Sequence, residues 1–152
     1  MDITQTFYDN LAPHYDKLFL DWQSATQEQA QILSRLLQNY GFDTSARILD
    51  CACGIGTQSI GLAALGYSVT ASDISTAELE EVSRKLDEIY YKEKRALEQA
   101  IAVRKADKNI SDDEMDEIAD MEEQLIELEE KHAENMKEIV SNATDGILDS
   151  VK

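Results

Sequence analysis

The stretch that most constrains the fold of this chain is residues 47–73, RILDCACGIGTQSIGLAALGYSVTASD. It begins with an apolar run, passes through Gly54 and Gly56, continues with residues that favour a helix, and ends in a second run suited to a strand. Two adjacent parallel strands need a crossover of a dozen or more residues, normally a helix, and the roughly 17 residues between the runs are enough. We therefore predict strands at 46–50 and 68–73 with a helix between them.

The glycines between these runs indicate what could bind there. Gly54 and Gly56 have no Cβ, so the chain can turn sharply off the strand, and a ligand can approach the backbone amides at the start of the helix. Asp73 lies 17 residues beyond Gly56. That is close to the spacing at which an acid at the end of a second strand accepts hydrogen bonds from a ribose. The pattern suits an adenosine-bearing ligand.

Two departures from the dinucleotide-binding pattern narrow the choice of ligand. Ser59 occupies the third position of G-x-G-x-x-G, and Asp50 ends the strand before the loop. The array D-x-x-x-G-x-G, followed by a second acid, resembles the motif of class I methyltransferases that use S-adenosylmethionine. In that family the loop lies against the amino-acid part of the cofactor, and the second acid holds the ribose hydroxyls. The resemblance implies that S-adenosylmethionine is bound by Asp50, Gly54, Gly56 and Asp73.

The segment before this stretch extends the resemblance. Residues 2–40 predict two helices with a break at Pro13. Within them, FYDNLAPHYDKLFLDW resembles the N-terminal cap of glycine- and sarcosine-type small-molecule N-methyltransferases, in which aromatic residues close over the ligand. This implies that Tyr15 and Trp22 contribute to the cofactor site, with Tyr8 as a further candidate. The alternative is that these aromatic side chains are core residues of helix faces.

The second of these helices has an apolar face that should pack against the rest of the domain. The spacing of its apolar residues fits a helix, and Gly41 follows where such a helix should end. The predicted face consists of Ala30, Leu33, Leu36, Leu37 and Tyr40.

The spacing of His14 and of the two cysteines does not predict a metal site. His14 stands beside Pro13 with no second ligand at a suitable spacing. Cys51 and Cys53 are two residues apart on a strand end, so their side chains cannot easily form a bridge. We expect both to be reduced, buried thiols.

After Asp73 the methyltransferase pattern stops and the composition changes. Residues 1–75 carry a net charge of −5 and hold five of the six glycines, whereas residues 76–152 carry −12. The second part has no alternating run that would predict further strands. We therefore predict two domains, a partial methyltransferase-like domain at 1–75 and an acidic helical hairpin at 76–152. The fold class is an incomplete Rossmann-like α/β half joined to an all-α half, mostly helical overall.

The hairpin is predicted from two series of residues at heptad spacing. Lys108 and Asn109 interrupt the spacing, and Ser111 to Glu114, SDDE, matches a capping box that would start a second helix. The turn should therefore lie at 108–111, with the helices antiparallel and coiled-coil-like. The predicted seam comprises Leu79, Val82, Leu86, Ile89, Glu93, Ala96, Ala100 and Val103, then Met115, Ile118, Met121, Leu125, Leu128, His132, Met136, Ile139 and Ala143.

A seam of two helices leaves apolar residues uncovered, which predicts a partner. The uncovered set includes Tyr90, Tyr91, Leu97, Ile101 and Ile126. We favour a homo-oligomer or a protein partner bound through the hairpin. The alternative is a solvated pair of helices that folds only on itself.

The net charge of −17 restricts the other partners. A chain without a basic field is poorly suited to bind nucleic-acid phosphates or anionic membrane surfaces directly. No apolar run is long enough to span a bilayer, and the start, MDITQTFYDN, lacks the features of a signal peptide. We expect a cytoplasmic protein without nucleic-acid or membrane contacts.

The sequence therefore predicts a methyltransferase-like protein that binds S-adenosylmethionine, acts on a small molecule, and is incomplete as a monomer because further strands are missing. Methyl transfer is a direct displacement that needs alignment of the acceptor more than a strong acid or base, and the sequence identifies no catalytic residue. One alternative is a helical interaction or oligomerisation protein, natural or chimeric, that retains a non-catalytic methyltransferase fragment. A weaker alternative is an acidic mimic of nucleic acid.

Overall fold

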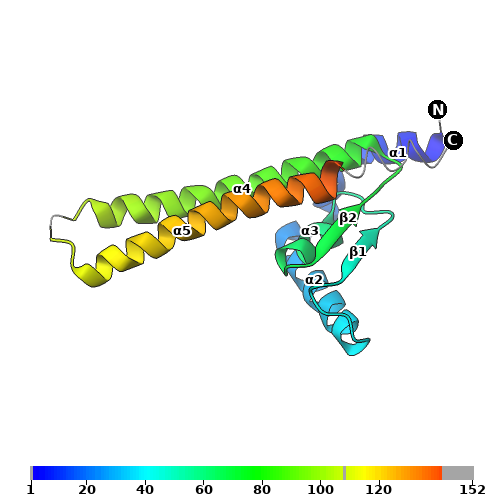
Figure 1. The fold of residues 1–152 in the computed structure, drawn as a ribbon. Helices are drawn as coiled ribbons and strands as arrows, with labels where there is room; N and C mark the ends of the chain where they lie inside the picture. The colour runs from blue at the N-terminus through cyan, green and yellow to red at the C-terminus, as the bar shows by residue number, and fades with distance from the viewer. Residues whose placement is uncertain (1, 108, 142–152) are drawn as a thin grey trace. The chain divides into compact units, whose positions relative to one another are not determined.

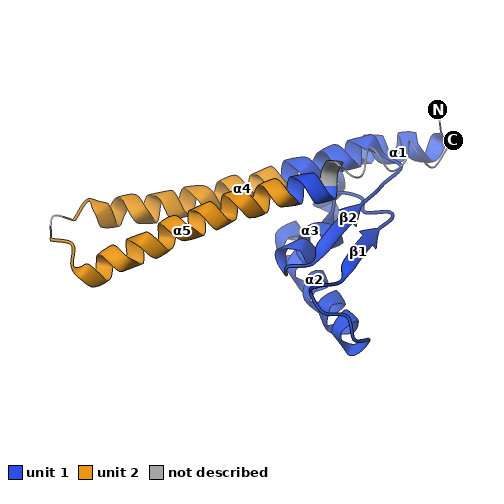
Figure 2. Cartoon of the chain, in the orientation of Figure 1, with its two compact units in different colours: residues 1–85, 135–152 blue, residues 86–134 orange. Residues whose placement is uncertain are grey.

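A computed structural model describes residues 2–107 and 109–141 of the 152 in the chain. The residues form two compact units, Met1–Lys85 with Asn135–Lys152, and Leu86–Glu134 (Figure 2). We call them unit 1 and unit 2 and describe each by itself. The domain boundary near residue 76 stays a prediction.

The centre of unit 1 is a strand–helix–strand unit (Figure 1). It consists of β1 (Arg47–Asp50), α3 (Thr57–Ala64) and β2 (Ser68–Ala71). The two strands pair in parallel, the first residue of one opposite the first of the other. Gly56 is the N-cap of α3. The predicted parallel strands and the helix that begins at the glycines are therefore confirmed, with slightly shorter strands than expected.

Three helical segments precede this unit. They are α1 (Ile3–Leu11), the 3-10 helix η1 (Ala12–Leu18) and α2 (Trp22–Asn39). Pro13 lies in the first turn of η1, where its missing N–H is tolerated, but it could not continue α1 as a regular helix. Asp21 caps α2 through its side chain. The predicted break at Pro13 is confirmed.

The buried face of α2 differs from the predicted one. Thr26 and Ala30 are buried, whereas Leu36 and Tyr40 are 50% and 76% exposed. Close packing explains this, because a Cβ built on Gly61 of α3 would come within 2.7 Å of the Thr26 carbonyl oxygen. Small residues are needed where the two helices touch. The prediction was wrong at Leu36 and Tyr40 because it ranked side chains by hydrophobicity and not by size.

The two strands are unequally covered. On β2, Val69 and Ala71 are fully buried, whereas Leu49 on β1 is 63% exposed. Within the described part of the chain, the sheet consists of these two strands. Parallel sheets are normally covered on both faces, so one face of β1 is open.

A π-helical segment, η2 (Met136–Ser141), packs against β2. The Ser68 hydroxyl donates a hydrogen bond to a carboxylate oxygen of Glu138 at 2.9 Å. Ile139 is 1% exposed. Residues far apart in the sequence thus complete the packing of unit 1 beside β2.

Two long helices, α4 (Thr76–Lys105) and α5 (Asp112–Asn135), supply the residues of unit 2. The start of α5 has the predicted capping box. The Ser111 amide donates to the Glu114 carboxylate at 2.8 Å, and the Glu114 amide donates to the Ser111 hydroxyl at 3.3 Å. Of the predicted turn, Lys108 lies outside the described residues.

Ion pairs between described residues of unit 2 join α4 to α5. Partner numbers generally fall along α5 as they rise along α4, which is the pattern of antiparallel neighbours. All these side chains are at least partly exposed, so solvent screens each pair and its contribution to stability is small. The pairs include Lys94 with Glu129 (2.6 Å), Arg104 with Glu117 (3.3 Å) and Lys105 with Glu122 (2.6 Å). In addition, the His132 Nε2 lies 3.1 Å from the Asp87 Oδ1.

The predicted seam is wrong at the end near the turn. Val103 and Met115 are 74% and 51% exposed, whereas Ile101, outside the predicted seam, is 9% exposed. A heptad repeats every 3.5 residues but a straight helix every 3.6, so a heptad seam drifts by about 20° per repeat. The last predicted seam residue, Ala143, lies outside the described residues. In α4 the buried or half-buried line runs through Leu86, Tyr90, Lys94, Leu97 and Ile101.

Helices dominate the described chain, as predicted. Among the residues that the structure describes, no helix combines the length and the hydropathy needed to cross a bilayer.

Candidate functional site

The loop between β1 and α3 requires glycine. Gly54 and Gly56 have φ angles of 54° and 81°, in the left-handed region that L-residues avoid. Gly56 is also tightly packed, since a Cβ there would lie 3.0 Å from a Val82 methyl and 3.1 Å from a methyl of Ile60. A side chain on residue 56 would therefore disturb both the turn and the packing beneath it.

Asp73, which follows β2, ties this loop to the start of α4. Its Oδ2 accepts a hydrogen bond from the Gly54 amide at 2.9 Å, and its Oδ1 accepts one from the Ser75 amide at 2.9 Å. The side chain is buried. Hydrogen bonds to an ionised acceptor are stronger than neutral ones. The contact fixes the glycine loop, the end of the second strand and the first turn of α4 in one place.

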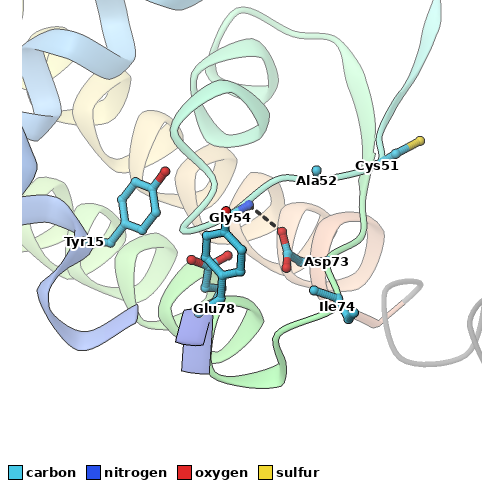
Figure 3. Close-up of a pocket in the computed structure, with 8 residues that line it drawn as sticks. Tyr15, Cys51, Ala52, Gly54, Asp73, Ile74 and Glu78 are labelled. Carbon is cyan, nitrogen blue, oxygen red and sulfur yellow. Dashed lines mark hydrogen bonds between the residues drawn. The ribbon is translucent and has the colours of Figure 1, made fainter. Parts of the chain in front are cut away.

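A cavity of about 250 Å³ opens beside this contact (Figure 3). Gly54 and Asp73 line it, together with Tyr8 from α1 and Tyr15 from η1. Its volume is below the roughly 300–1,000 Å³ of drug-sized ligand sites, so it would hold part of a cofactor-sized molecule. The other lining residues are Cys51, Ala52, Ile74 and Glu78.

Three of the predicted cofactor residues, Asp50, Gly56 and Trp22, do not line this cavity. Asp50 accepts a hydrogen bond from the Ser59 hydroxyl at 2.7 Å. The Trp22 indole N–H donates to the Thr57 hydroxyl at 2.9 Å. Asp50 thus ties α3 to the end of β1, Trp22 ties it to the start of α2, and Gly56 is its N-cap. Their part in cofactor binding stays a prediction, as does that of Gly54, Asp73 and Tyr15, which do line the cavity.

The sequence did not point to Glu78, which lies in the first turn of α4. The residue is 2% exposed, and Figure 3 shows its side chain between Tyr15 and Asp73. Its Oε1 has no hydrogen-bond partner among the described residues. Burial, and then the charge of the neighbouring Asp73, raises the pKa of Glu78 to about 7. A buried acceptor without a partner is rare in a folded protein and needs an explanation.

A local signal for Glu78 was present in the sequence. Ser75 and Glu78 have the S-x-x-E spacing of a capping box. Half of that box forms, since the Glu78 amide donates to the Ser75 hydroxyl at 3.1 Å. The other half does not, because the Ser75 amide donates to Asp73 instead. The Glu78 carboxyl is therefore turned into the cavity and not back onto the chain.

The environment of the Cys53 thiol in the loop favours its protonated form. Burial, followed by the charges of Asp50, Asp73 and Glu78, raises the pKa of the Cys53 thiol to about 12. Cys51 is exposed, so the expectation that both thiols are buried was wrong for Cys51. Among the residues that the structure describes, no three His, Cys, Asp or Glu side chains form a group that could hold a metal ion.

Comparison with known proteins bears on this site. The sequence profile of the family described as "Tellurite resistance protein TehB" matches residues 20–147. This span includes most of the loop and cavity residues, and it continues through α4 and α5 beyond the part in which the motifs resemble a methyltransferase.

A curated relative matches a shorter part of the chain. It is described as a putative methyltransferase of Geobacillus sp. (strain WCH70), and it is 37% identical over 73 residues, which are 45% of this chain and 27% of the relative. The match thus covers little more than a quarter of the length of that relative. No solved structure matches the chain.

Proposed function

The chain belongs to the TehB family, and on that premise we propose that it binds S-adenosylmethionine in the cavity of unit 1 and takes part in transfer of the methyl group to a small molecule. The curated relative, described as a methyltransferase, supports the same assignment.

One observation carries the proposal, the hydrogen bond from the Gly54 amide to the Asp73 carboxylate at 2.9 Å. It joins two residues 19 apart in the sequence at the edge where both parallel strands end. Ligands of parallel α/β sheets bind at that edge. Gly54, expected to meet the amino-acid part of the cofactor, and Asp73, expected to meet its ribose, therefore line one cavity.

The side chains of the cavity suit such a ligand. Tyr8 and Tyr15 offer aromatic faces, and the carboxyl groups of Asp73 and Glu78 offer acceptors. Aromatic faces and carboxylates both attract cations, and S-adenosylmethionine carries a sulfonium and an ammonium group. When bound, it would supply an electrophilic methyl group. The chain's own residues would orient the cofactor and exclude water, and no acid or base need act on the acceptor.

We expect binding by the chain alone to be weak. The cavity would enclose only part of the ligand, and the open face of β1 at Leu49 is where a fuller sheet would be covered. A dissociation constant above about 10 μM, equivalent to roughly −7 kcal/mol, is the expected range.

Titration calorimetry with S-adenosylmethionine tests the proposal. Asp73→Ala should weaken binding by about 1.5–3 kcal/mol, the range for a hydrogen bond to a charged group, or roughly 10- to 150-fold. Asp73→Asn, which keeps the shape, separates lost charge from lost packing, and Asp120→Ala on the exposed surface of α5 is the matched control. No heat at millimolar ligand would contradict the proposal.

Since the family is described by tellurite resistance, tellurite is the first methyl acceptor to assay.

A second candidate function is self-association through unit 2. Large apolar side chains remain exposed there, Tyr91 at 50% and Ile126 at 58%. Apolar residues left uncovered on a helical surface often mark an interface. Light scattering at tens of micromolar should give at least twice the monomer mass, and Tyr91→Lys combined with Ile126→Lys should restore the monomer. A monomer mass for the unmodified chain would remove this candidate.

A further inference from the structure

The two carboxyl groups that line the cavity, those of Asp73 and Glu78, differ in their hydrogen-bond partners. Each oxygen of Asp73 accepts a backbone amide at 2.9 Å. Glu78 is more deeply buried, at 2% exposure, yet its Oε1 has no partner among the described residues. Buried polar atoms are nearly always hydrogen-bonded, because an unpartnered one has lost its water without replacement. Because Glu78 lines the cavity, its Oε1 could accept a hydrogen bond from a donor group of a bound ligand.

We propose that Glu78 is the ligand-recognising carboxylate of the cavity, and that its Oε1 accepts a hydrogen bond from a hydroxyl or ammonium group of the adenosine ligand. The inference rests on the proposed function, since it names a recognition residue within the same site. Asp73 has a second role beside ligand binding, because it also holds the Gly54 amide and the start of α4 in place.

The charged groups around Glu78 disfavour its ionised form in the absence of a ligand. The charged groups nearest to it are the carboxylates of Asp73 and, on α1, Asp9. Asp9 is itself engaged by the Ser75 hydroxyl at 2.6 Å. On the same helix, the Lys85 ammonium is paired with Asp16 at 3.0 Å. The free site therefore favours a proton on Glu78, and a hydrogen bond between the protonated carboxyl and Asp73 contributes to the raised pKa.

The remaining neighbours do not change this balance. The Cys53 thiol on the glycine loop stays protonated at neutral pH, because its pKa is raised to about 12. Tyr8 and Tyr15 line the same cavity and offer hydroxyl groups as hydrogen-bond partners. A donor or cation from the ligand would favour the ionised carboxylate, so binding should release a proton from Glu78.

Calorimetric titration of the whole chain with S-adenosylhomocysteine tests the inference. The titrations are made at pH 6 and pH 8, each in two buffers of different ionisation enthalpy. In the ligand-free chain the pKa of Glu78 is about 7, so the ionised fraction rises about tenfold from pH 6 to pH 8. The affinity for the ligand should rise by the same factor. The buffer dependence of the heat near pH 7 should show a released proton.

Glu78→Gln should bind more weakly at pH 8 and should lose both the pH dependence and the proton release. The exposed Glu80 on the same helix supplies the control; Glu80→Gln should behave as the unmodified chain does. Circular dichroism would verify that the variants fold.

Two outcomes would overturn the inference, and they differ. Binding by the unmodified chain that is independent of pH and releases no proton would remove the role of Glu78 and leave the proposed function intact. No binding at either pH, at millimolar ligand, would remove the proposed function and this inference with it.

Discussion

At the scale of single residues, the buried carboxyl of Glu78 makes folding depend on pH. Its pKa is raised from 4.5 to about 7 in the folded chain, so the folded state holds the proton more tightly than the unfolded state. The stability linked to that proton is fully present below pH 4.5 and is lost as the pH rises through 7.

This predicts a pH-dependent difference between the unmodified chain and Glu78→Gln. From pH 4.5 to 8 the unmodified chain should lose up to about 3 kcal/mol relative to the variant, at 1.36 kcal/mol per pKa unit. Urea denaturation across this range measures the loss. Parallel stability curves would show that Glu78 ionises as freely in the folded chain as in the unfolded one.

A second residue-scale prediction compares two glycines with positive φ. Gly41→Ala places a side chain in the left-handed region at φ 87° but in open space, and should cost about 1–2 kcal/mol. Gly56→Ala adds close contacts with Val82 and Ile60, and overpacking should raise the total to about 2–5 kcal/mol. Thermal unfolding of the two variants gives the comparison. Equal losses would mean that the loop relaxes around the new methyl group.

At the scale of elements, the contact between α2 and α3 reverses a general rule. An alanine normally stabilises a helix by up to about 1 kcal/mol relative to glycine. At Gly61 the new Cβ would meet the Thr26 carbonyl oxygen at 2.7 Å and the Ala30 Cβ at 2.8 Å. We therefore expect Gly61→Ala to destabilise the chain by about 1–3 kcal/mol.

Chemical denaturation measures this change, with Gln31→Ala on the exposed side of α2 as the control. The control should stay within about 0.5 kcal/mol of the unmodified chain. A gain in stability for Gly61→Ala would mean that the two helices are not in close contact.

The elements also show how far the sequence could be interpreted. The strands beside the glycine loop were predictable because the period of the pattern changes there. The face of α2 was not, since its contact with Gly61 depends on a neighbour that the sequence of α2 does not reveal. The buried residues of α4 depart from heptad spacing, because the period of a helix depends on how it packs against its neighbour.

The same limits apply to the site. Gly54 and Asp73 were predictable, because their types and spacing follow from the geometry of parallel strands. Glu78 was not, because which way its carboxyl turns depends on Asp73 taking the Ser75 amide first. Competition between two acceptors for one donor is a property of the folded loop.

At the scale of the whole molecule, the central claim is that unit 1 holds an adenosine-bearing cofactor at the glycine loop. Nuclear magnetic resonance of the ¹⁵N-labelled chain during titration with S-adenosylhomocysteine tests it most directly, because each amide reports on its own surroundings. We predict saturating shifts for the Gly54 and Ile74 amides, at the cavity wall. The amides of Gly41 and Gly66, which do not line the cavity, should stay unchanged. No shifts at millimolar ligand, or shifts confined to unit 2, would contradict the claim.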